Sequence, residues 1–188
     1  MGVPYSLFHG GFGLVTLGNI PKPTFWTFVI FKKLKENYKS CIQKDDTSIV
    51  VIDENETIKG VCYNMTLTRG ENDFINSYEF DGEGEYVILT KRVDEEVCNP
   101  LKVWHDLGET NANSKEEIET VRASAYPQIS TNIIKSVNGK ISFDIELKEN
   151  AMVYFEIKKA DIKKVISNID SSLSIELQIK EALKLLLK

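Results

Sequence analysis

Short apolar runs separated by polar turns dominate the middle of this chain. Residues 48–52 and 58–63 are rich in β-branched residues, and the polar stretch 53–56 lies between them. This spacing predicts a β-hairpin. A further strand is expected over 85–90, and the long polar connection before it is expected to carry a short strand near 78–80.

The strongest local turn signal is Asn138-Gly139, which lies between the apolar run 133–137 and the alternating positions of 141–147. Asn-Gly favours a two-residue hairpin turn, so these two runs are predicted to pair. A last strand is expected over 152–157, with every second residue from Val153 facing inward. Several short strands with few helices between them favour a mainly β fold, an antiparallel two-layer β-sandwich.

Two helices are predicted outside these strands. Pro21 and Pro23 indicate the start of the first, because proline is tolerated only in a first turn, and this N-terminal helix is expected to run to about Tyr38. Its apolar residues cover more than one stripe, which is typical of a helix buried on several sides. The second helix begins after Ser114, the N-cap of a capping box, and is expected to run to about Ala125.

A third helical pattern follows residue 159. Its apolar face consists of Ile175, Ile179, Ala182, Leu183 and Leu186. Such a C-terminal helix could dock against the sheet of this chain or bind a partner, and the sequence leaves both alternatives open.

Composition limits the kinds of partner and the cellular compartment that are expected for this chain. A chain of 188 residues with 42% hydrophobic content can bury a core, and its formal charge of -5 argues against nucleic acid as a partner. No apolar run approaches the roughly 20 residues that span a bilayer, so no membrane association is expected. Three cysteines at irregular spacings fit neither a disulfide framework nor a zinc site, so we expect a reducing, cytoplasmic location. With only two histidines, no metal or other cofactor is expected.

The segment Phe8-His9-Gly10-Gly11-Phe12-Gly13-Leu14-Val15, followed by Ile20-Pro21-Lys22-Pro23-Thr24-Phe25-Trp26, resembles the end of the (β/α)8 catalytic domain of glycoside hydrolase family 39, the β-xylosidases. The similarity runs in collinear order from about Val3 to about Ile157. The further segments that carry it are 92–96, Asn99-Pro100, 104–108, 114–125 with Pro127, and 138–141.

The resemblance implies an organisation in three parts. Residues 1–38 correspond to the last loop and helix of a truncated (β/α)8 barrel, and residues 39–158 to an accessory β-sandwich. Residues 159–188 extend past the usual end of the family and are expected to form a C-terminal helical extension. On this interpretation the N-terminal helix is left over from the barrel.

The same resemblance implies a function for the complete enzyme, which hydrolyses β-xylosidic bonds with retention through two glutamates. Both glutamates lie upstream of Met1 in the family, so this chain is expected to be a non-catalytic C-terminal fragment. His9 and Phe12 are expected to lie near the substrate of the complete enzyme. The expected partner is the missing catalytic barrel, and a homo-oligomer could form through the N-terminal or the C-terminal helix.

The residues of this chain offer weak candidates for chemistry of their own. Acidic residues gather at 81–85 and 94–96, but a retaining glycosidase needs two carboxyls about 5 to 5.5 Å apart across a pocket, and loop carboxylates are usually solvated. Aromatic side chains can stack on sugars, which leaves an independent carbohydrate-binding or protein-interaction module as the alternative function. Core packing is the expected role of the five candidates, Tyr5, Phe8, Phe12, Trp26 and Trp104.

Overall fold

The structure, a computed structural model, describes residues 7–8, 12–16, 18–66, 73–109 and 114–160. The helices are α1 (Pro23–Lys35), α2 (Pro100–Asp106) and α3 (Lys115–Ala123), and the strands are β1 (Tyr38–Lys44), β2 (Ser48–Asp53), β3 (Ile58–Tyr63), β4 (Phe74–Asp81), β5 (Glu85–Val93), β6 (Gln128–Lys135), β7 (Lys140–Leu147) and β8 (Met152–Lys159). The predicted C-terminal helix, with its face from Ile175 to Leu186, lies outside the described residues.

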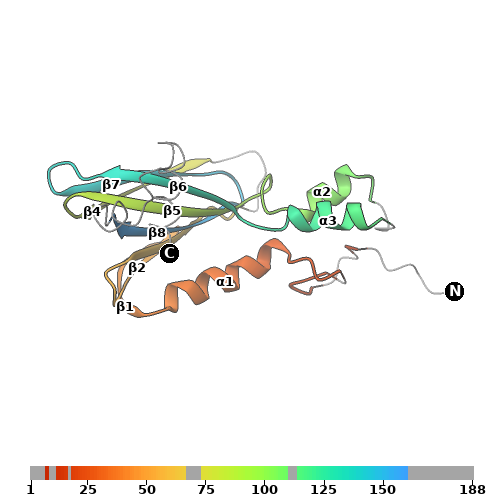
Figure 1. The fold of residues 1–188 in the computed structure, drawn as a ribbon, viewed down its shortest axis with the longest axis horizontal. Helices are drawn as coiled ribbons and strands as arrows, with labels where there is room; N and C mark the ends of the chain where they lie inside the picture. The colour runs from red at the N-terminus through yellow and green to blue at the C-terminus, as the bar shows by residue number, and fades with distance from the viewer. Residues whose placement is uncertain (1–6, 9–11, 17, 67–72, 110–113, 161–188) are drawn as a thin grey trace, which may run out of the picture.

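The strands form two antiparallel sheets that pack face to face (Figure 1). The large sheet has six strands in the order β1-β2-β3-β8-β5-β6, and the small sheet pairs β4 with β7. Val50, Phe155 and Ile157 of the large sheet share one buried cluster with Tyr78 and Leu147 of the small sheet. The predicted antiparallel β-sandwich is confirmed.

The predicted hairpin over 48–63 is also confirmed. Strands β2 and β3 pair without interruption from Ser48 opposite Cys62 to Ile52 opposite Ile58. Strand β8 continues the sheet beside β3 and then pairs with β5 on its other side. The expected strands 85–90, 78–80 and 152–157 are all present, and each is longer than predicted.

The predicted pairing across Asn138-Gly139 is wrong. Both residues have the positive φ of the expected turn, 53° and 77°, and Val137 and Lys140 bridge its ends. The strands then diverge, because β6 pairs with β5 while β7 pairs with β4 in the other sheet. In the small sheet the apolar face of β7, with Ile141 fully buried, is covered by the large sheet. Burial of that face between the layers therefore outweighs continuation of the hairpin.

Strand β1 and helix α2 were not predicted from the sequence pattern. All seven residues of β1 are exposed, so this edge strand has no apolar alternation to reveal it. Helix α2 has only seven residues, too few for a clear helical period. Its start is stabilised by the side chain of Asn99, which accepts a hydrogen bond from the amide of Lys102 at 3.2 Å.

Helix α1 lies along the face of the large sheet opposite the small sheet (Figure 1). Ile30 and Leu34 pack on Val51, Val61 and Tyr154. The helix starts at Pro23 as predicted but ends at Lys35, before the expected Tyr38. The chain reverses at residue 37, whose φ of 54° lies in the left-handed region. The N-terminal helix is therefore docked on the sandwich of its own chain.

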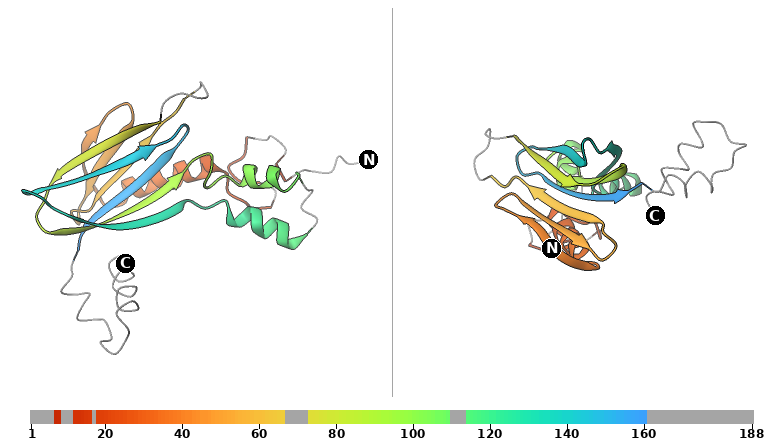
Figure 2. Two further views of the ribbon diagram at one scale, coloured as in Figure 1. Left: turned by 90° about the horizontal axis from the view of Figure 1, so that it is seen from above. Right: turned by 90° about the vertical axis from the view of Figure 1, so that its left-hand side faces the viewer.

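Helices α2 and α3 form a second packed unit at one end of the molecule (Figure 2). Trp104, Val121 and Ala125 are buried there with Ile20 from the N-terminal segment. The predicted cap of α3 is confirmed, since the hydroxyl of Ser114 accepts a hydrogen bond from the third helical amide at 3.1 Å. No helix in the described ranges has the length and apolarity to cross a membrane.

Candidate functional site

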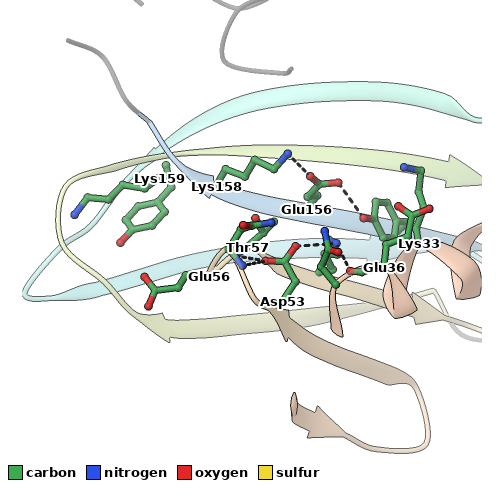
Figure 3. Close-up of a pocket in the computed structure, with 13 residues that line it drawn as sticks. Lys33, Glu36, Asp53, Glu56, Thr57, Glu156, Lys158 and Lys159 are labelled. Atoms are coloured by element: carbon green, nitrogen blue, oxygen red, sulfur yellow. Dashed lines mark hydrogen bonds and ion pairs between the residues drawn. The ribbon is translucent and has the colours of Figure 1, made fainter. Parts of the chain in front are cut away.

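Two surface regions lie at opposite ends of α1. A polar depression of about 670 Å³ lies at its C-terminal end, against the β2–β3 turn and the end of β8 (Figure 3). Two apolar hollows lie at its N-terminal end. Among the described residues, the first region holds two of the three buried charged side chains, Asp53 and Lys59, and the second region carries exposed apolar side chains.

The floor of the polar depression is a buried ion pair between Asp53 and Lys59. The Asp53 Oδ2 to Lys59 Nζ distance is 2.9 Å, and both side chains are more than nine-tenths buried. Asp53 Oδ1 accepts hydrogen bonds from the amides of Asn55 and Thr57, each at 2.9 Å. Lys59 Nζ also donates to the carbonyl of Glu36 at 2.9 Å, which ties the end of α1 to the sheet.

Burial and hydrogen bonding act against each other on the pKa of Asp53. Desolvation raises this pKa, but the hydrogen bonds from Lys59, Thr57 and Asn55 outweigh it, so the pKa lies below its usual value. The carboxylate is therefore ionised in the folded protein at neutral pH, and its charge is matched by the ammonium of Lys59.

A second carboxylate, Glu156, lies on the wall of the same depression. Its Oε1 is 2.6 Å from Lys158 Nζ, and its Oε2 accepts a hydrogen bond from the Tyr154 hydroxyl at 3.0 Å. Burial raises the pKa of Glu156, but Lys158 and the hydrogen bond from Tyr154 lower it by more. The pKa of Glu156 therefore lies below its usual value. Burial and the neighbouring carboxylate raise the pKa of Tyr154.

These two carboxylates are poorly suited to acid/base catalysis. A glycosidase acid must stay protonated near neutral pH, which requires a raised carboxyl pKa. Asp53 and Glu156 have lowered pKa values and lysine partners. Their arrangement indicates binding or structural support.

The two acidic clusters noted in the sequence have structural partners in the fold. Asp81 lies 2.7 Å from Lys140, and Glu85 lies 2.7 Å from Lys135. The Asp94 carboxylate closes its own loop by accepting hydrogen bonds from the amides of residues 96 and 97, both at 2.8 Å. These groups are used in strand pairing and loop closure.

The cysteines are free thiols, with Cys41 exposed and Cys62 and Cys98 buried. Burial raises the pKa of Cys62 to about 11 and that of Cys98 to about 12. Both buried thiols are therefore protonated and poor nucleophiles at neutral pH. Within the ranges that the structure describes, no group of three metal-ligating side chains comes together.

The apolar region at the start of α1 consists of two hollows that share Pro23 and Thr24. One, of about 330 Å³, is lined by Phe31, Met65 and Met152, and the other, of about 500 Å³, by Leu101 and Trp104. Phe28 lies between Thr24 and Phe31 in helical spacing, so these three share one helix face. We call Pro23, Phe28, Phe31, Met65 and Leu101 the apolar strip.

The sequence-predicted residues have different places in this arrangement. Phe12 is fully exposed, whereas His9 lies outside the described residues, so their expected position near a substrate stays a prediction. Among the aromatic candidates, Trp104 is buried against Phe8 with a ring-centroid distance of 5.5 Å, and Trp26 donates a hydrogen bond to the carbonyl of Ala125 at 2.7 Å. Core packing is thus confirmed for Trp104 and is wrong for Phe12, whose side chain is fully exposed. Tyr5 lies outside the described part of the chain.

The polar depression was missed by sequence reasoning. Its members Asp53 and Glu156 are far apart in the chain, and only sheet pairing brings β2, β3 and β8 together. One signal in the sequence could have indicated part of this site. Because alternate residues from Val153 face the core, Tyr154 and Glu156 must face the opposite side of the sheet.

Comparison with known proteins identifies relatives of this chain. The family model for glycosyl hydrolases family 39 matches residues 1–142. A β-xylosidase of Geobacillus stearothermophilus is 32% identical over 166 residues, which cover 85% of this chain and 31% of that protein. A β-xylosidase of Caldicellulosiruptor saccharolyticus is 31% identical over 160 residues, covering 80% of this chain and 32% of that protein. The chain therefore spans about a third of the length of these relatives.

Solved structures share the arrangement described above. The GH39 enzyme from Xanthomonas axonopodis pv. citri matches 84% of this chain and 34% of its own, with a TM-score of 0.70 and 16% identity. A monomeric β-xylosidase from Caulobacter crescentus CB15 matches 84% of this chain and 35% of its own, with a TM-score of 0.67 and 18% identity. At these identities the likeness shows the fold alone.

Proposed function

Since the chain belongs to glycosyl hydrolases family 39, we propose that it is the non-catalytic C-terminal portion of a β-xylosidase-like enzyme. Its complete form would hydrolyse β-xylosidic bonds with retention. Support comes from the curated relatives, both β-xylosidases, of which this chain spans about a third. The two catalytic carboxyls would lie in the remaining part of the enzyme. The paired, ionised state of Asp53 and Glu156 fits this assignment.

The observation that carries the proposal is the uncovered apolar strip. Phe28 is 64% exposed and Met65 is 84% exposed, although α1 buries its other side on the sheet. Clustered apolar side chains on a protein surface usually belong to an interface, and burying one large side chain contributes about 1.5 to 3 kcal/mol. A catalytic barrel is the partner that fits, with α1 as its last helix.

Two further properties belong to the same proposal. The free cysteines support a reducing, cytoplasmic location. The division into barrel remnant 1–38, sandwich 39–158 and extension 159–188 is retained as a prediction. A homo-oligomer through the N-terminal helix would use the apolar strip when the barrel is absent.

Replacing Phe28 by glutamate should weaken association with the barrel at least tenfold, because a carboxylate would be buried in an apolar contact. The partner would be the part of the Geobacillus stearothermophilus β-xylosidase that lies outside the region matched by this chain, produced together with it. Affinity purification followed by analytical ultracentrifugation would measure the complex.

Ile75→Glu is the matched control, because Ile75 is 62% exposed on β4 of the small sheet, away from α1. This variant should associate as the unchanged chain does. Equal association of the Phe28→Glu chain, or none by the unchanged chain, would refute the proposed contact. A dimer of the chain alone that Phe28→Glu abolishes would reassign the apolar strip to self-association.

A further inference from the structure

The polar depression has the size and construction of a small-molecule site. Its volume of about 670 Å³ lies within the range of about 300 to 1,000 Å³ that ligand pockets occupy. Three separate parts of the chain form its walls, the last turn of α1, the β2–β3 turn and the end of β8 (Figure 3). Tyr86 of β5 adds an aromatic ring to the lining.

The floor of the depression is held in one arrangement. Asp53 and Lys59 neutralise each other, and Lys158 neutralises Glu156 (Figure 3). Tyr154 is fully buried, with its hydroxyl on Glu156. A floor whose polar groups are already hydrogen-bonded is preorganised and would lose little entropy when a ligand binds.

The rim, in contrast, presents polar side chains that have no hydrogen-bond partner within the described part of the chain. These are the side chains of Asn37, Asn55, Glu56 and Lys159. Two amides, one carboxylate and one ammonium offer both donors and acceptors. A ligand that both donates and accepts hydrogen bonds at several positions would match them.

The charge of the rim selects against ions. Lys33 and Lys159 contribute two positive charges, and Glu36 and Glu56 contribute two negative charges. An anion would meet the carboxylates, and a cation would meet the ammonium groups. A neutral polyhydroxy ligand avoids both conflicts, because each hydroxyl group can donate to a carboxylate and accept from a lysine or amide. The ring of Tyr86 packs partly on the core between the sheets, and the remaining part lines the depression, where it suits contact with the apolar face of a pyranose.

Glu56 keeps an unfavourable backbone conformation at this rim. Its φ of 61° lies in the left-handed region, which a side chain other than glycine or asparagine occupies at a cost of about 1 kcal/mol. Asparagine would fit this turn better, yet the position holds a glutamate that lines the depression. Strained backbone conformations are common at functional sites.

We propose that this depression binds a neutral saccharide of one or two units, held by Asn55, Glu56 and Lys159 beside Tyr86. The proposal is independent of the association with a barrel, because the chain alone contains every residue that it requires. It would place a sugar-binding function on the sandwich itself.

Titration of the isotope-labelled chain with xylose and xylobiose, followed by NMR, tests the proposal. We expect saturable shifts at residues 53–57 and 156–159, with a dissociation constant of about 1 mM, equivalent to about 4 kcal/mol. Glu56→Asn and Lys159→Ala should each weaken binding about tenfold. Glu56→Asn relieves backbone strain, so its loss of binding could not be attributed to unfolding.

Phe28→Glu, which changes a residue of α1 outside the lining of the depression, is the matched control and should leave sugar binding unchanged. Sodium sulfate serves as the anion probe. The absence of saturable shifts with either sugar would overturn the proposal, as would shifts by sulfate alone or unchanged binding by Glu56→Asn. Those outcomes would contradict sugar binding but not the proposed association with the barrel. Conversely, a chain that binds sugar but does not associate with the barrel would contradict only the proposed function.

Discussion

Replacing Lys59 by methionine is expected to lower the free energy of unfolding by about 3 kcal/mol. The substitution keeps the length of the side chain but removes the cation that lies 2.9 Å from Asp53 Oδ2. It also removes the donor to the Glu36 carbonyl at the end of α1. The buried carboxylate would then have only two amide partners. Since a domain of this kind is stable by about 5 to 15 kcal/mol, urea denaturation would detect such a loss readily.

The matched control is Lys102→Met. Lys102 also pairs with a carboxylate, Asp106 Oδ2 at 3.0 Å, but this pair is exposed to solvent. Exposed ion pairs contribute little, so the urea midpoint of this variant should stay where it is. If Lys59→Met unfolds at the same urea concentration as Lys102→Met, the buried pair does not hold α1 to the sheet.

Replacing Gly60 by alanine is expected to destabilise the sandwich by about 2 kcal/mol through overpacking. A Cβ atom at this position would come within 2.5 Å of Phe155 Cε1. The ring has nowhere to move, because Phe155 is fully buried with its ring centroid 4.9 Å from Tyr78 and 5.3 Å from Phe143. The glycine in the middle of β3 is therefore required by the ring on β8 opposite it.

A double-mutant cycle tests this explanation. Phe155→Leu alone should lose about 1.5 kcal/mol, because the smaller side chain fills the space less well. Combined with Gly60→Ala, it should lose about 1 kcal/mol less than the sum of the two changes, since the new methyl group occupies space that the ring vacates. Additive losses would show that Gly60 is needed for a reason other than the Phe155 ring.

Most of the fold could be predicted from local pattern. The β2–β3 hairpin and the cap at Ser114 follow from short-range chemistry. The sandwich follows from the number of short strands. The N-terminal helix was predicted from Pro23, although its end was placed three residues late, because Asn37 reverses the chain at a positive φ.

The incorrect or missing predictions concern features that long-range packing determines. The turn at Asn138-Gly139 formed as predicted, but its strands joined different sheets because Ile141 and Ile145 of β7 are buried between the layers. Strand β1 has no buried residue, so no alternation marked it. The polar depression depends on residues from β2, β3 and β8, and their proximity is a property of strand order. Pattern analysis alone contains no information on that order.

We propose that this chain supports catalysis but does not perform it, and turnover of a chromogenic β-xyloside tests this proposal most directly. The pure 188-residue chain should give no hydrolysis above background. Production together with the complementary part of the Geobacillus stearothermophilus relative should give hydrolysis that neither polypeptide shows alone. Robust turnover by the pure chain, at a rate proportional to its concentration, would contradict the account.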